Sequence, residues 1–221
     1  VFLPCLALGM SPFIMQSTES LIAVCFNSSL QTYGGDIAVG AMTVLTSIMQ
    51  FAMMPLQGLT QGAQPIVSYN YGARNAQRVR AAFRCLLRAC VTYSLLLWAL
   101  VQLFPRMFIL MFNSSPELVE YASWALRIYM AATGIFGVQI ACQQTFVALG
   151  NAKTSLFLAV LRKIILLIPL IYILPHFFAD KAFAVFLAEP VADVLAVLTT
   201  STMFAFQFKR SMAELEKHPE L

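Results

Sequence analysis

Three acidic residues lie inside long apolar stretches of this sequence. Glu19 falls in the short polar run QSTES, and Glu189 and Asp193 stand four residues apart in LAEPVAD. A charged side chain within the hydrocarbon of a bilayer costs about 2.5 kcal/mol or more, so such residues mark ion or substrate pathways or pair with opposite charges. These three carboxyls are therefore the first candidates for holding a proton, a metal cation or an organic cation.

Glu19 has polar neighbours on both sides. Gln16, Ser17, Thr18 and Ser20 surround it, and their oxygens could help to hold a cation or a ligand beside the carboxylate. We expect a cation- or substrate-binding site that includes Glu19 and Gln16. The alternative is a hydrogen bond between helices that has no part in transport.

Glu189 and Asp193 share one face of a helix because they are four residues apart. The neighbouring cations Arg162 and Lys163 lie in the preceding apolar segment. Charges inside a membrane are usually paired, so we expect these four residues to form a structural ion-pair group that joins the last two segments.

Two glutamines, Gln139 and Gln143, also stand four residues apart within an apolar segment. Their side chains project from the same helical face. They could line a polar cavity for a cation or substrate, or they could only hydrogen-bond between helices. The sequence favours neither alternative.

The composition indicates a membrane protein. Hydrophobic residues make up 60% of the chain and charged residues 11%, whereas soluble domains carry roughly a quarter charged residues. The apolar runs reach the roughly 20 residues that a spanning helix needs, and they lack the alternation of barrel strands. We therefore predict an all-α membrane protein with six transmembrane helices, at about 3–30, 37–69, 79–104, 116–149, 153–174 and 181–208.

Turn and capping residues mark several boundaries. The run QTYGGD (31–36) predicts the first turn, Ser115 followed by Pro116 predicts a helix start, and Gly150 with Asn151 predicts a helix stop. Pro55, Gly58, Gly62 and Pro65 predict a break within the second segment. We place the helical lobe at 1–209 and a polar cytoplasmic tail at 210–221.

The basic residues predict how the chain lies in the bilayer. The connections after the second and fourth segments, the tail and the adjoining helix ends hold 11 of the 14 lysines and arginines. Because basic loops stay in the cytoplasm, both chain ends are expected there. The same rule explains the net charge of +4 without nucleic acid as a partner.

No motif indicates an enzyme. The phosphate-binding pattern GxxxxGK[ST] is missing, and the five cysteines and two histidines do not have the spacing of metal ligands. We therefore expect no catalytic residue, no metal site and no cofactor beyond a coupling ion. The opening VFLPCLAL, without an initiator methionine or a basic leader, reads as a chain cut from a longer protein.

Four stretches resemble one transporter family. LPCLALGMSPFIMQSTES, QGAQPIVSYNYGA, QTFVALGNAKTS and LAEPVAD are similar to the C-terminal half of multidrug and toxic compound extrusion (MATE) transporters, of their MepA-like bacterial branch. The resemblance runs from Val1 to about Lys209, and the second stretch is its most specific part.

The resemblance implies one lobe of a two-lobe transporter with a central cavity. It implies antiport of cationic, drug-like compounds against protons or sodium ions across the bacterial inner membrane, with the N-terminal lobe as partner. Glu19 matches an acid on the lobe's first helix that binds the cation, whereas Phe136 stands where many relatives have a second acid. The alternatives are a lipid-linked oligosaccharide flippase of the same superfamily and a membrane scaffold that transports nothing.

Overall fold

All regular structure in residues 2–217 is helical. The computed structural model describes the backbone of these residues and the side chains of residues 17–216 except Ala152. The elements in chain order are α1 (Phe2–Gly72), α2 (Ala76–Leu103), α3 (Pro105–Leu110), α4 (Pro116–Tyr129), α5 (Thr133–Ala148), α6 (Ala152–Val160), the π-helix η1 (Leu161–Leu167), α7 (Ile168–Ile173), the 3₁₀ helix η2 (Leu174–His176) and α8 (Lys181–Lys217). This confirms the all-α fold.

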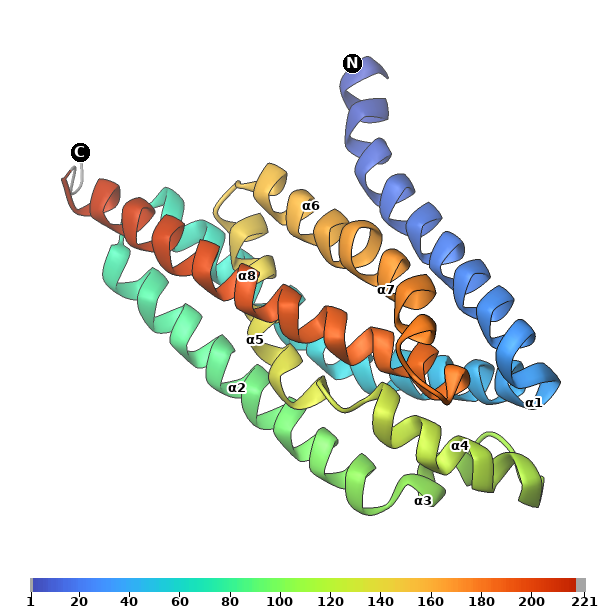
Figure 1. Ribbon diagram of the computed structural model, residues 1–221. Coiled ribbons are helices and arrows are strands. Elements are labelled where there is room, and N and C mark those ends of the chain that lie inside the picture. The colour runs from blue at the N-terminus through green and yellow to red at the C-terminus, as the bar shows by residue number, and fades with distance from the viewer. Residues whose placement is uncertain (1, 218–221) are drawn as a thin grey trace.

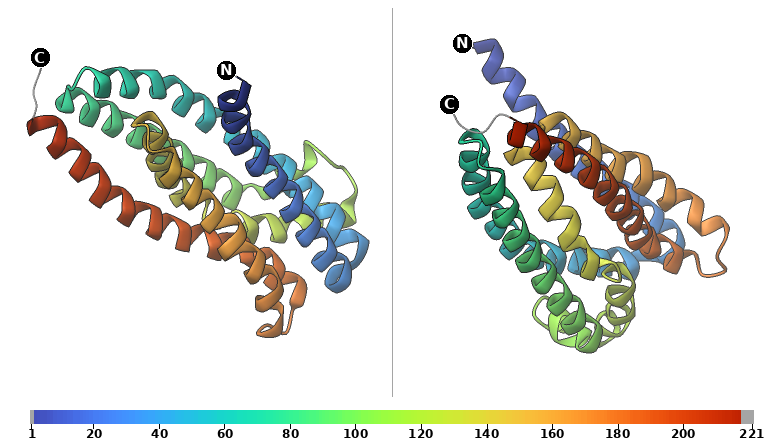
Figure 2. Two further views of the ribbon diagram at one scale, coloured as in Figure 1. Left: turned by 90° about the horizontal axis from the view of Figure 1, so that it is seen from above. Right: turned by 90° about the vertical axis from the view of Figure 1, so that its left-hand side faces the viewer.

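The first element, α1, consists of two helices that meet at a sharp turn. Gly35 has non-helical angles (φ 67°, ψ −164°) in the middle of its 71 residues, and glycine adopts such a positive φ without steric cost. A straight helix of this length would be about 107 Å long, more than three times the roughly 30 Å of a hydrocarbon core. Figures 1 and 2 show the chain turning back here, within the predicted turn QTYGGD.

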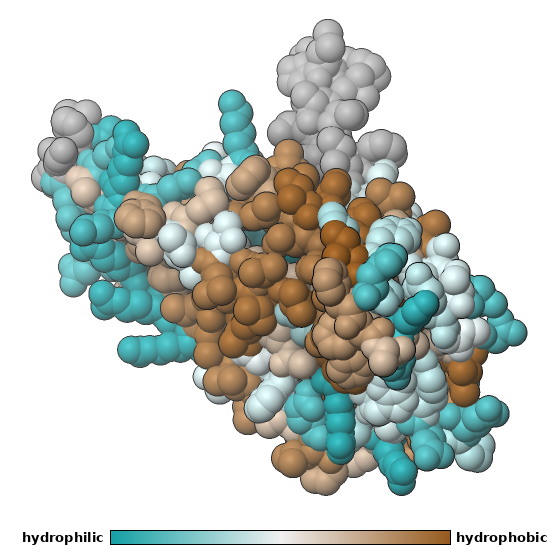
Figure 3. Space-filling model, viewed as in Figure 1, coloured by the Kyte–Doolittle hydropathy of each residue, from teal (hydrophilic) through white to brown (hydrophobic). Residues whose placement is uncertain are grey.

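Within the described residues, four helices are long and apolar enough to cross a membrane, and α4 with α5 forms a fifth, bent candidate. One of the four, Ser17–Gly72, is divided into two helices at Gly35, so the arrangement is consistent with the six predicted spans. Figure 3 shows hydrophobic side chains across the middle of one face and hydrophilic ones toward both of its ends. This distribution fits a protein that crosses a bilayer.

The break predicted in the second span is wrong. Residues 36–72 keep helical backbone angles, and Pro55 and Pro65 lie inside the helix. Each proline removes one backbone donor, and transmembrane helices tolerate this because neighbouring groups and small local adjustments satisfy the freed carbonyl.

The fourth span bends instead. Its two helices, α4 and α5, meet at 50° across residues 130–132. Helices kink where a side chain inserts into the hydrogen-bond ladder, and here the amide Nε2 of Gln102 donates to the carbonyl oxygen of Arg127 at 2.8 Å. The start of this span at Pro116 is confirmed, although Ser115 makes no side-chain capping bond.

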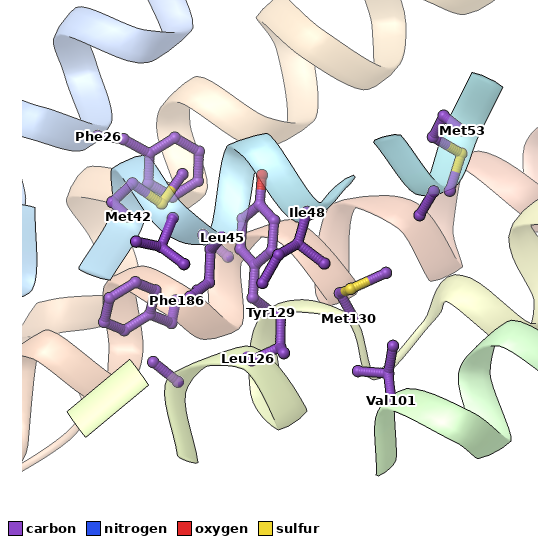
Figure 4. Close-up of a cluster of buried hydrophobic side chains, with 14 of the residues drawn as sticks. Phe26, Met42, Leu45, Ile48, Met53, Val101, Leu126, Tyr129, Met130 and Phe186 are labelled. Carbon is purple, nitrogen blue, oxygen red and sulfur yellow. The ribbon is translucent and has the colours of Figure 1, made fainter. Parts of the chain in front are cut away.

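One large cluster of buried hydrophobic residues joins most of the helices. Figure 4 shows Phe26, Leu45 and Ile48 of α1 around Tyr129 of α4, with Phe186 of α8 beside them. Since these side chains are almost fully buried, they fix the orientation of the helices that carry the charged residues.

A second cluster ties the basic ends of the helices together. Met212 of α8 is 1% exposed and packs with Val67, Ala76, Val79 and Ala148 from the ends of α1, α2 and α5. The helix α8 continues to Lys217, so its end does not coincide with the tail boundary predicted at 209/210. The connections that sequence analysis placed on one side therefore lie together, as Figure 1 also shows.

Candidate cation-binding site

Glu19 lies on the first half of α1 with 53% of its side chain exposed. The ammonium group of Lys163, which is 18% exposed and comes from η1, forms an ion pair with its carboxylate. Ser17 and Ser20 are exposed beside it, whereas Thr18 is buried. The side chain of Gln16 lies outside the described residues. The carboxylate is thus bound on one side and open on the other.

A polar face accompanies Glu19 along α1. Ser20, Asn27 and Gln31 are exposed and spaced by seven and four residues, which places them on one face of the helix. Gln50, Gln57 and Gln61 repeat the same spacing on the second half. We name these two rows, one on each half of α1, the polar face of α1. Side chains of this kind at membrane depth contact another protein surface or water rather than lipid.

Sequence analysis did not identify this face. The signal was present in the spacing of the three glutamines, but the runs around them are apolar enough to read as ordinary spanning helices. The structure adds the deciding observation, which is that all six residues are exposed.

Arg162 lies between the two carboxylates of α8. Its Nε atom is 2.6 Å from Asp193 Oδ1, and its Nη2 atom is 2.8 Å from Glu189 Oε1. All three side chains are at most 12% exposed, and the guanidinium carbon lies 4.5 Å from the centre of the Phe136 ring on α5. The planar guanidinium suits this arrangement because it presents several donors in fixed directions.

Lys163 takes a different partner from the one that the sequence suggested. The structure brings Arg162, Glu189 and Asp193 together, but it directs Lys163 to Glu19 on α1. Two consecutive residues of η1 thus connect two neighbouring helices. A π-helix adds an extra residue to the helical turn, so the faces of its residues cannot be read from regular helical spacing.

The glutamines of α5 lie at helix interfaces. The Nε2 atom of Gln143 is 3.4 Å from the carbonyl oxygen of Ser155 in α6, which is a contact between helices. Gln139 is 1% exposed, and its Oε1 atom has no hydrogen-bond partner among the described residues. The structure does not bring either glutamine to Glu19 by any described hydrogen bond or ion pair.

Glu19 lies at the exposed edge of a group of five charged residues. Its half-exposed carboxylate holds an ammonium group, and the buried carboxylates of Glu189 and Asp193 hold a guanidinium.

The MatE family model matches residues 12–173, well over half of the chain. The chain belongs to the MATE family. "Multidrug export protein MepA" of Staphylococcus haemolyticus is 20% identical over 192 residues, which cover 86% of this chain and 42% of that protein. The alignment falls on the C-terminal half of the relative.

Solved MATE structures share the fold. A MATE transporter in the bent conformation superposes with a TM-score of 0.86 at 18% identity, over 94% of this chain and 46% of that one. The MATE multidrug transporter DinF-BH is 36% identical with a TM-score of 0.76, over 89% of this chain and 44% of that one. The chain therefore spans slightly less than half the length of these relatives and has the fold of one MATE lobe.

Two positions that the family resemblance singled out differ in their surroundings. Glu19 is half-exposed, whereas Phe136 is buried and lies against Arg162. A second acid at position 136 would face a guanidinium that Glu189 and Asp193 already neutralise. In this MATE lobe, the charged group beside position 136 is Arg162 of η1, which is paired with the two acids of α8.

Proposed function

We propose that this chain is the C-terminal lobe of a secondary active transporter that exports cationic, drug-like compounds in exchange for protons or sodium ions. The family membership supports transport, and the names of the relatives support multidrug export. The observation that carries the proposal is Glu19, a half-exposed carboxylate in a membrane span that holds an ammonium group.

The polar face of α1 supports a partner on the same side. It carries exposed polar residues on both halves of α1, and an N-terminal lobe facing it would enclose a polar pathway. Exposed methionine and aromatic side chains near this face, such as Met54 and Phe51, offer adaptable apolar contacts to varied organic cations. Alternating access would then come from rocking of the two lobes.

The positions of the basic residues support an orientation in the bacterial cell membrane. Arg74, Arg78, Arg84, Lys209 and Arg210 are exposed at the end where α1, α2, α5 and α8 meet. Because basic connections remain in the cytoplasm, this end and both chain ends would face the cytoplasm in a multi-pass inner-membrane protein.

A flippase for lipid-linked sugars fits the charges less well. An anionic substrate needs free basic groups at the pathway, but Arg162 and Lys163 are bound to carboxylates. Of Arg127, Arg162 and Lys163, the basic residues that could face an anionic substrate, only Arg127 is exposed. The described charges therefore favour a cationic substrate.

The proposed function is tested by ethidium efflux from cells that express the full-length transporter. Cells are loaded with the dye, and an inward proton gradient and an inward sodium gradient are imposed separately. We expect one of the two gradients to accelerate efflux several-fold over cells with an empty plasmid. If neither gradient changes the rate although the protein is present in the membrane, the chain belongs to a scaffold or to a transporter of another substrate.

A further inference from the structure

The ion pair between Glu19 and Lys163 joins two side chains that differ in their exposure. The carboxylate of Glu19 is 53% exposed, whereas the ammonium group of Lys163 reaches it from a lysine side chain that is 18% exposed. An organic cation that approaches along the polar face of α1 would find the carboxylate already occupied. Lys163 is thus a cation tethered to the protein at the place where a transported cation would bind.

The backbone around Lys163 is held firmly by the preceding residue. Arg162 contacts Glu189 and Asp193 at 2.8 and 2.6 Å and also lies over the Phe136 ring. This anchor fixes the start of η1 against α8. Only the flexible side chain of Lys163 then needs to move when its partner on α1 changes.

The carboxylates of Glu189 and Asp193 offer Lys163 a second binding position. Arg162 supplies one positive charge to two carboxylates, so the group of Arg162, Glu189 and Asp193 has a net charge of −1 when both acids are ionised. Lys163 directly follows Arg162 in η1, so its side chain leaves the backbone one residue from the group that contacts both acids. Among the described residues, the buried Tyr129 of α4 is a further titratable group near these acids.

We propose that Lys163 is a built-in competitor that occupies Glu19 when no substrate is bound, and that a transported cation displaces it toward Glu189 and Asp193. This rests on the proposed function, in which Glu19 binds the cation. The five charged residues together carry a net charge of −1 when all are ionised. One monovalent cation therefore neutralises the group, and its departure lets the lysine return to Glu19.

The test is the affinity of the purified full-length protein for ethidium, measured by fluorescence titration in detergent. In Lys163→Met the competitor is missing, so ethidium should bind about fivefold more tightly, which corresponds to the loss of one partly exposed ion pair. Lys153→Met removes an exposed lysine from α6 and should leave the affinity unchanged. Lys163→Arg keeps the competitor and strengthens its hold on the carboxylate, so ethidium should bind more weakly.

A further variant tests the second position of the lysine. Glu189→Gln removes the net negative charge behind Lys163, so the lysine should remain at Glu19 and ethidium should bind more weakly than to the wild type. Unchanged affinity in both Lys163→Arg and Glu189→Gln overturns the proposal, and so does weaker binding in Lys163→Met.

Glu19→Gln distinguishes a failure of the proposed cation site from a failure of the proposed competitor. If this variant loses ethidium affinity but the Lys163 variants do not change it, Glu19 binds the cation and the lysine is not a competitor. If Glu19→Gln binds as tightly as the wild type, Glu19 is not the cation site, and the proposed site and the competitor are both wrong.

Discussion

Replacing Arg162 with methionine should prevent the lobe from folding stably. The change leaves Glu189 and Asp193, which are 8% and 2% exposed, without the guanidinium that both contact. Removing one partner of a buried ion pair typically costs about 3–5 kcal/mol, because the remaining charge stays buried. We expect Arg162→Met to reduce the amount of full-length protein in the membrane sharply and to lower the melting temperature of the purified protein.

Two further variants show whether charge or shape causes this loss. The triple variant Arg162→Met/Glu189→Gln/Asp193→Asn removes all three charges and should recover much of the lost stability, since no buried charge is left alone. Arg162→Lys keeps the charge, but an ammonium group lacks the fixed planar donors with which the guanidinium contacts both acids. The stability of this variant should therefore be intermediate. An Arg162→Met protein that melts like the wild type would show that the ion pairs do not hold α8 in place.

Replacing Gly137 with alanine should force α2 and α5 farther apart and lower the stability of the protein. A Cβ atom at this position would lie 2.5 Å from the carbonyl oxygen of Cys90 and would also collide with the hydroxyl of Ser94. Small residues let transmembrane helices approach closely, and a clash with backbone cannot be relieved by rotating a side chain. We expect a loss of about 1–3 kcal/mol, the usual cost of overpacking a core, measured as a lower melting temperature.

Gly58→Ala is the matched control for this prediction. Gly58 lies in the helical second half of α1, and a Cβ atom there meets nothing within 4 Å. Alanine is favoured over glycine inside a helix by roughly 0.5–1 kcal/mol, so stability should stay equal or rise. If both variants melt alike, α2 and α5 do not depend on the close approach at Gly137.

The sequence predicted the spans because membrane length is a strong constraint. Apolar runs of spanning length were visible, and Gly35, Pro116 and Gly150 marked turns or ends that the structure confirms. Each of these residues has a local physical reason to end or start a helix. The local sequence was therefore sufficient to predict the turns and helix ends at these positions.

The irregular parts of the helices depend on contacts between distant residues. The bend after α4 has no proline or glycine at residues 130–132, and it is supported by Gln102 from another helix. Conversely, Pro55 and Pro65 suggested a break that the helix does not make. Composition alone does not distinguish a span that breaks from one that keeps helical backbone angles throughout.

The site was predicted in its parts but not in its connections. The rule that charges inside apolar segments are paired correctly predicted the contacts of Arg162 with Glu189 and Asp193. The pairing of Lys163 with Glu19 was missed because η1 is a π-helix, which changes the direction in which consecutive side chains leave the backbone. The residues LRKIILL contain no feature that predicts a π-helix.

The role of Glu19 is tested most directly by comparing Glu19→Gln with the wild type in gradient-driven ethidium efflux. Glu117→Gln is the matched control, since Glu117 is an exposed acid in the first turn of α4, where sequence analysis places the opposite side of the membrane. We predict that Glu19→Gln abolishes efflux at normal expression, whereas Glu117→Gln transports like the wild type. Undiminished efflux by Glu19→Gln would contradict the account, because the carboxylate could then be neither the coupling site nor the substrate site.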